Sequence, residues 1–204
     1  MIFILDLGLG NCISLRNAFK RIGHSCVISD DLDHLLKATH IVLPGVGSFD
    51  AFIGNLKQNH RLEMTLINKI LEDQTPTLGI CLGMQVLMES SSEGKLDGLA
   101  IVPGHVKKLE ASNKIRVPNI GWSSVSPFNS HYPGNCLFDK PEKYYFCHSF
   151  YVDIDEDICL GTSCHGLEFM AAFGFSNIVG VQFHPEKSHA QGLDFLRRFV
   201  SFSS

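Results

Sequence analysis

The sequence has no long apolar run, no internal repeat and no pair of cysteines at C-x-x-C spacing. A membrane-spanning helix needs about 18 apolar residues, so no membrane association is predicted. Met1 leads directly into a short apolar segment without a preceding basic region, which is unlike a secretory signal peptide. The seven cysteines are odd in number and scattered, whereas secreted disulfide frameworks normally have an even count. We therefore expect a cytoplasmic protein with free thiols.

Charge is also scarce, because Asp, Glu, Lys and Arg make up only 19% of the 204 residues. The 17 basic and 21 acidic side chains give a net charge of −4, so no broad basic field is present to attract nucleic acid. No His or Cys spacing typical of zinc occurs. After the Gly8-Leu9-Gly10 turn, Ile13 stands where a dinucleotide-binding loop has its third glycine. We expect no metal site, no cofactor and no nucleic-acid partner.

Short apolar runs alternate with helix-like segments in the first half of the chain. Buried strands are predicted at Ile2–Leu5, Cys26–Ser29, 41–43 and Thr77–Ile80, and helices at 14–22, 62–71 and from 84 to 88. This alternation is typical of βαβ units, which form a mainly parallel sheet.

The second half, after Gly98, is rich in turn residues and predicts strands instead. These are placed at 102–110, 114–117, 144–153 and 168–173, a strand at 179–182 is expected to return to the central sheet, and a helix at 192–202 closes the chain. We predict a single domain over residues 1–204, an α/β sandwich whose mainly parallel sheet is flanked by helices and carries an antiparallel excursion.

The segment around Cys81 carries the clearest chemical signal. Gly79-Ile80-Cys81-Leu82-Gly83 places a cysteine between a predicted strand and a predicted helix, in the arrangement of a nucleophile elbow. The glycines leave room for a sharp turn, the helix N-terminus favours a thiolate, and the Leu82 N–H can donate to an oxyanion. By itself the motif is equally compatible with a structural cysteine packed beside glycines.

A catalytic partner for Cys81 is found 103 residues later in the chain. His184 follows a predicted strand, and Glu186 lies two residues beyond it. In a parallel sheet both Cys81 and His184 lie at carboxyl ends of strands, where such sheets form sites. His184 then serves as general base and acid, and Glu186 orients its imidazole. A His-Pro-Glu segment alone is just as compatible with a surface turn, but together with the elbow it favours a Cys-His-Glu triad.

These motifs resemble the class I (triad) glutamine amidotransferases, and within them the glutaminase subunit of imidazole glycerol phosphate synthase. The resemblance extends over essentially the whole chain. The segments that carry it are Asp6–Asn11, Leu43–Phe49, Gly79–Gln85, Pro118–Trp122, His148–Phe150 and Gln182–Ser188.

The resemblance implies an activity and a partner. Cys81 attacks the side-chain amide of L-glutamine, releases ammonia and leaves a thioester that water hydrolyses. The partner is a (β/α)8-barrel cyclase subunit that uses the ammonia to form imidazole glycerol phosphate and AICAR in histidine biosynthesis. The residues implied at the oxyanion and the substrate are Gly45, Val46, Gly47, Leu82, Gln85, His148, Ser149 and Phe150. Those implied near the partner are Asn11, Asn119, Trp122, Tyr145 and Lys187.

Four positions depart from the family pattern, namely Leu7, Asn119, Ser123 and Phe150. They avoid the triad, and most fall toward the partner side. A paralogous glutaminase that feeds a sugar amidotransferase in surface-polysaccharide synthesis is therefore the alternative. Two other classes are a binding protein on an inactive amidotransferase scaffold and a cysteine peptidase or thiol hydrolase. The presence of Cys81 and His184 argues against the first, and Gln85 with the loop at 44–47 against the second.

Overall fold

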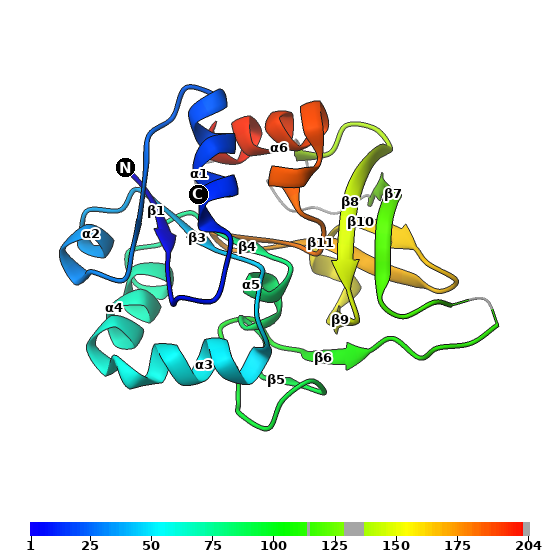
Figure 1. Ribbon diagram of the computed structural model, residues 1–204, viewed down its shortest axis with the longest axis horizontal. Helices are drawn as coiled ribbons and strands as arrows, with labels where there is room; N and C mark the ends of the chain where they lie inside the picture. The colour runs from blue at the N-terminus through cyan, green and yellow to red at the C-terminus, as the bar shows by residue number, and fades with distance from the viewer. Residues whose placement is uncertain (114, 129–136, 202–204) are drawn as a thin grey trace.

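The computed structural model describes residues 1–113, 115–128 and 137–201 (Figure 1). The elements of the first half are β1 (Ile2–Leu5), α1 (Cys12–Arg21), β2 (Cys26–Ser29), α2 (Leu32–Leu36), β3 (His40–Leu43), α3 (Phe49–Gln58), α4 (His60–Leu71), β4 (Thr77–Ile80), α5 (Leu82–Gln85) and β5 (Ser90–Ser91). Those of the second half are β6 (His105–Lys108), β7 (Asn119–Pro127), β8 (Glu142–His148), β9 (Phe150–Asp153), η2 (Glu156–Ile158), β10 (Cys159–Cys164), β11 (Glu168–Phe175), β12 (Ile178–Val181), η3 (Pro185–Lys187) and α6 (His189–Ser201).

A nine-stranded sheet connects the two halves of the chain, in the order β2-β1-β3-β4-β12-β11-β10-β7-β8. The pairs from β2 to β12 are parallel, and those from β12 to β8 are antiparallel. A second sheet contains β5, β6 and β9. The predicted fold class is confirmed, including the return of the strand before His184 to the parallel part of the sheet.

Strand β1 shows how the sheet separates two hydrophobic cores. Successive side chains of a strand point to opposite faces. Ile2 and Ile4 belong to the core that contains α1 and α6, whereas Phe3 and Leu5 belong to the core that contains α3 and α4. Figure 1 shows these helix pairs above and below the sheet. Burial on both faces explains why β1 is apolar throughout instead of alternating.

Two predicted strands of the second half were wrong. The run at 144–153 is interrupted at Ser149, so β8 pairs with β7 in the large sheet and β9 pairs with β6 in the small one. The sequences of both parts favour a strand, and only their pairing with β7 and β6 separates them into two sheets. No strand occupies 115–117, and β7 begins at Asn119 instead. Strand β10 was missed, because its sequence has little local strand signal and it is held by β7 and β11 on its two sides.

Helix boundaries differ more modestly. The predicted helices at 14–22, 62–71 and 192–202 begin two or three residues earlier, and the helix expected from 84 to 88 is the single turn α5. Helices α2 and α3 were not predicted, although the buried α3 residues Phe49, Phe52, Ile53 and Leu56 have helical spacing. Lys114 and Phe202, named in predicted elements, and Cys136 lie outside the described residues.

Candidate active site

Three adjacent parallel strands place the predicted site residues at one edge of the sheet. Strand β4 pairs with β3 on one side and with β12 on the other. Strand β3 leads into the loop at 44–47, β4 ends immediately before Cys81, and β12 ends three residues before His184. Two residues that are 103 positions apart in sequence therefore lie at neighbouring strand ends, as the topology of a parallel sheet requires.

The backbone at Cys81 has the strained conformation of a sharp strand-to-helix turn. Its φ is 49° and its ψ is −106°, and positive φ is rare for a residue with a side chain. The Cys81 N–H donates to the Val181 carbonyl at 2.7 Å, which fixes this turn to the end of β12. Because the following helix α5 has only four residues, its dipole is small, and the charge of the sulfur depends mainly on nearby side chains.

Close packing explains both glycines of the elbow. A Cβ atom on Gly83 would clash with the carbonyl group of Leu43, and one on Gly79 would lie 2.6 Å from the carbonyl oxygen of Gly83. Gly45 faces the same restriction, because a Cβ there would meet Ile80 and Cys81. The loop at 44–47 therefore packs directly against the nucleophile, and only glycine permits this approach.

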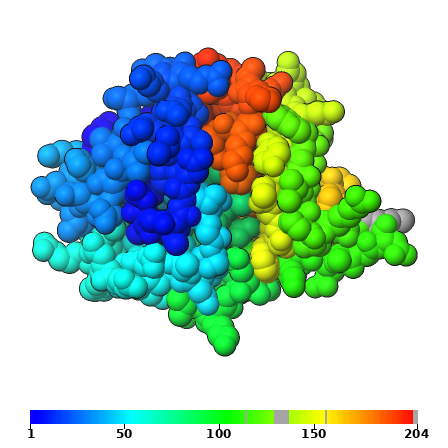
Figure 2. Space-filling model, viewed as in Figure 1, coloured from blue at the N-terminus to red at the C-terminus, as the bar shows by residue number. Residues whose placement is uncertain are grey.

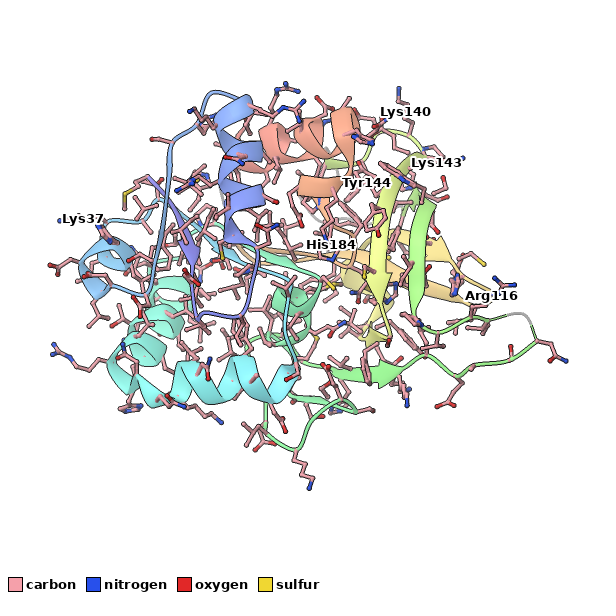
Figure 3. All side chains as sticks on the ribbon, viewed as in Figure 1. Lys37, Arg116, Lys140, Lys143, Tyr144 and His184 are labelled. Atoms are coloured by element: carbon pink, nitrogen blue, oxygen red, sulfur yellow. The ribbon has the colours of Figure 1, made fainter. Side chains whose placement is uncertain are left out.

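His184 is fixed by its main chain and by Glu186. The main-chain N–H of His184 donates to the Tyr145 carbonyl at 2.9 Å, and the His184 carbonyl accepts a hydrogen bond from Ser188 Oγ at 2.6 Å. Ser188 Oγ in turn accepts from the Tyr145 N–H at 3.0 Å. His184 Nδ1 lies 2.8 Å from Glu186 Oε1, and both side chains are buried. Figure 3 shows His184 toward the centre of the molecule, beside β8.

The surroundings of His184 favour its protonated form. Burial disfavours the charged ring, but hydrogen bonds and Coulombic attraction from Cys81 and Glu186 outweigh burial and raise the pKa of His184 to about 10. Attraction to both groups stabilises an imidazolium between a thiolate and a carboxylate. The arrangement is suited to hold a cysteine thiolate next to a proton donor.

A pocket of about 350 Å³ opens over Cys81 and His184. Figure 2 shows a hollow here, between the light-blue N-terminal part and yellow β8, with green atoms at its base. The other predicted substrate residues that line it are Gly45, Val46, Gly47, Leu82, Gln85, His148, Ser149 and Phe150. Glu186 lies behind His184, so the structure brings together the predicted triad and substrate residues.

His148 enters the pocket wall as a neutral imidazole. Burial, which is the largest cause, and the neighbouring His165 and His184 lower the pKa of His148 to about 4. Its Nδ1 donates to the Phe150 carbonyl at 2.8 Å, so its Nε2 accepts from Asn119 Nδ2 at 2.9 Å. Asn119 is only 2% exposed. This residue, expected at the partner interface, thus supports the pocket wall from inside the protein.

The other residues expected near a partner lie at the surface. Trp122 is 44% exposed, stacks on His189 with ring centroids 5.1 Å apart, and meets Tyr145 edge to face. Lys187 Nζ lies 5.8 Å from the centre of the Tyr145 ring and also lines the pocket. Asn11 is exposed and caps α1 through Ser14.

Sequence reasoning assigned no role to Glu93 or to Gln182, although both belong to this site. Glu93 lines the pocket, and partial desolvation raises the pKa of its carboxyl group. Gln182 is fully buried and donates to Cys81 Sγ at 3.4 Å. Gln182 belongs to the segment that carried the family resemblance, whereas no local motif distinguishes Glu93 from other acidic loop residues.

One protein family accounts for nearly the whole chain. The model of the family "Glutamine amidotransferase class-I" matches residues 3–201. The chain belongs to this family. The amidotransferase is 40% identical over 201 residues to "Imidazole glycerol phosphate synthase subunit HisH 2" of Methanococcus maripaludis, with 98% of each chain covered. It is 41% identical over 206 residues to "Imidazole glycerol phosphate synthase subunit HisH" of Bdellovibrio bacteriovorus, again with 98% of each chain covered.

A solved structure shares the fold of this amidotransferase at much lower sequence identity. "Crystal structure of glutamine amidotransferase" matches with a TM-score of 0.76 and 16% identity, over 98% of this chain and 97% of the other. Within residues 1–113, 115–128 and 137–201, no group of three or more His, Cys, Asp or Glu side chains could hold a metal ion. In the same described ranges, no helix is long and apolar enough to cross a membrane.

Proposed function

We propose that this amidotransferase is the glutaminase subunit of an imidazole glycerol phosphate synthase, which hydrolyses glutamine and supplies ammonia to a cyclase subunit. One observation carries the chemistry: a strained cysteine and a buried His-Glu pair share one pocket. The names of relatives about 40% identical over nearly the full length support the pathway. They do not favour the surface-polysaccharide alternative.

The first half of the reaction forms a thioester. The Cys81 sulfur attacks the side-chain carbonyl carbon of glutamine, and the proton from the thiol resides on His184. The imidazolium then protonates the leaving nitrogen as the C–N bond breaks, so ammonia departs and a γ-glutamyl thioester remains. Glu186 stabilises the cation on His184 and keeps its ring in place.

The second half returns Cys81 to its starting state. Neutral His184 takes a proton from water, whose oxygen attacks the thioester carbon and displaces the Cys81 sulfur. In both halves a negative oxygen develops on the substrate. The N–H of Leu82, the first of α5, and the main chain of Gly45, Val46 and Gly47 are the groups that bind it.

The polar ends of glutamine require complementary charges and donors. Glu93 is an acidic side chain in the pocket wall, and its carboxylate suits the α-ammonium group of the substrate. Gln85, His148, Ser149 and Phe150 surround the rest of the molecule. A pocket of about 350 Å³ accommodates an amino acid of this size.

The partner proposed for the surface around Trp122 is a (β/α)8-barrel cyclase. Ile120 and Trp122 are large apolar side chains that β7 leaves exposed, as is typical of the centre of an interface. Tyr145 contacts Trp122 through its ring and His184 through its main-chain carbonyl. A partner bound to this surface is therefore connected to the catalytic His184 through a single residue, Tyr145.

The deciding experiment measures glutamate release by the purified chain, alone and with the cognate cyclase loaded with its nucleotide substrate. We expect low activity alone and strong hydrolysis in the loaded complex, with imidazole glycerol phosphate formed in step with glutamate. The Cys81→Ala complex is the control and should release none. Activation only by a barrel protein from a glycan-synthesis operon would keep the hydrolysis but overturn the pathway.

A further inference from the structure

Gln182 lies between the end of β12 and His184, and its side chain contacts the nucleophile. Its Nε2 is 3.4 Å from Cys81 Sγ, its Oε1 accepts from Gln85 Nε2 at 3.1 Å, and the residue is 0% exposed. Its main-chain N–H is bound to Ala171 on β11 at 2.9 Å. Both ends of the residue are thus fixed, and its amide has little freedom to turn.

The neighbouring groups determine which end of the Gln182 amide faces the sulfur. Gln85 Nε2 lies 3.0 Å from the Phe150 carbonyl, which can only accept, so the nitrogen of Gln85 must occupy that place. Its second N–H then needs another acceptor, and Gln182 Oε1 provides it. The opposite end of the Gln182 amide, the N–H donor, consequently faces Cys81 Sγ.

We infer that Gln182 is a positioning residue that donates an N–H to the Cys81 sulfur and so favours the thiolate used in the hydrolysis proposed above. An N–H group stabilises an anionic sulfur much more than a neutral thiol, which is itself a weak donor. The residue does not line the substrate pocket. It reaches the substrate indirectly, through Cys81 and through Gln85, whose N–H it accepts.

A second contact of the sulfur has the opposite preference. The Cys147 carbonyl oxygen lies 3.8 Å from Cys81 Sγ and can accept the proton of a neutral thiol, but repels a thiolate. Gln182 counteracts this repulsion from the segment that follows β12, while His184 supplies the positive charge. The amide of Gln182 is set from the pocket wall, through Gln85 and Phe150, and therefore keeps its donor on the sulfur whichever charge the sulfur carries.

The test compares the pH dependence of Cys81 alkylation by iodoacetamide in the wild-type chain and in Gln182→Met, which keeps the side-chain length but has no donor. Peptide mass spectrometry follows Cys81 and, as an internal reference, Cys147, which is exposed and lines the same pocket. We expect the midpoint for Cys81 to move upward by roughly one pH unit or more, with an unchanged limiting rate. The titratable groups around the pocket, identical in both proteins, are His184, Glu186, His148, Glu93, Lys187 and Cys147.

Gln182→Glu provides a second variant of equal shape, and its carboxylate should shift the midpoint at least as far. The matched control is Asn177→Asp. Asn177 is another buried amide next to β12, at the end remote from the site, where it donates to Ile70 and Thr75. This control loses buried hydrogen bonds but should leave the Cys81 profile unchanged.

Superimposable profiles in wild type and in the folded Gln182 variants would refute the inference, as would an equal shift in Asn177→Asp. Alkylation requires neither the cyclase nor glutamine. A complex that releases glutamate while the profiles coincide therefore removes only the role of Gln182. A shifted profile with no glutamate release would remove the proposed function instead.

Discussion

Mild acid should weaken the fold through His148, the neutral imidazole held between Asn119 and Phe150. Its pKa is lowered by burial from 6.5 to about 4. Between these values the unfolded chain binds a proton that the folded chain does not, so the free energy of unfolding falls as the pH falls through this window. A difference of about 2.5 in pKa corresponds to a loss of about 3 kcal/mol in the free energy of unfolding, and this loss is complete below pH 4. In a domain of this size the loss lowers Tm by roughly 10 °C.

The assay is chemical and thermal unfolding, followed by circular dichroism at pH 7.5 and pH 4.5, in wild type and His148→Gln. The carboxyl groups titrate in both proteins. Subtracting the pH-dependent loss of stability of His148→Gln from that of the wild type therefore leaves the contribution of His148. His184 is present in both proteins, so its own contribution cancels in this difference. Its raised pKa gives a contribution that is complete below pH 6.5 and is lost progressively as the pH rises from there toward about 10, so part of it is already absent at pH 7.5.

Asn119→Asp provides a test of the cause. A carboxylate at this position can accept a hydrogen bond from protonated Nε2, so the acid-dependent loss should shrink. If wild type and His148→Gln lost the same stability between pH 7.5 and pH 4.5, the argument from burial would be refuted.

Three further outcomes are expected. A glutamine-analogue electrophile such as a diazoketone should label Cys81 in preference to the exposed Cys147, and peptide mass spectrometry that found the adduct mainly on Cys147 would contradict the site. Glu186→Gln should lower kcat for glutamate release in the activated complex, but the decrease should be one to two orders of magnitude smaller than that caused by Cys81→Ala. Equal decreases would give Glu186 a larger role. Ser188→Ala removes the link between Tyr145 and His184, so it should lower the free energy of unfolding by about 1–3 kcal/mol, and an unchanged denaturation midpoint would show that the link is not structural.

Local sequence determined most of the parallel half of the fold. Strand β1 is apolar at every position because both its faces are buried, and its short uninterrupted apolar run therefore predicts a buried strand without knowledge of its neighbours. The second half was harder, since β8 and β9 read as one continuous strand. Their separation into two sheets depends on pairing with β7 and β6, partners distant in sequence.

The residue types of the site could be predicted from the sequence because a nucleophile elbow and a His-x-Glu segment have fixed local spacing. The surroundings of these residues could not be predicted. Glu93 reaches the pocket from a loop after β5, and the buried environment of Asn119 results from its pairing opposite His148. No local pattern encodes these placements, because each depends on which distant segments the sheet brings together.

The elbow glycines, the reactive cysteine, the histidine and the apolar strands could all be predicted before folding is considered, because they follow short-range steric and hydrophobic rules. The charge states and hydrogen-bond directions depend instead on the folded arrangement. The low pKa of His148, the high pKa of His184 and the N–H that Gln182 presents to Cys81 arise from burial and from contacts across β4, β8 and β12. Electrostatic effects of this kind depend on the distances between groups and on the exclusion of solvent, and both are established only when the chain folds.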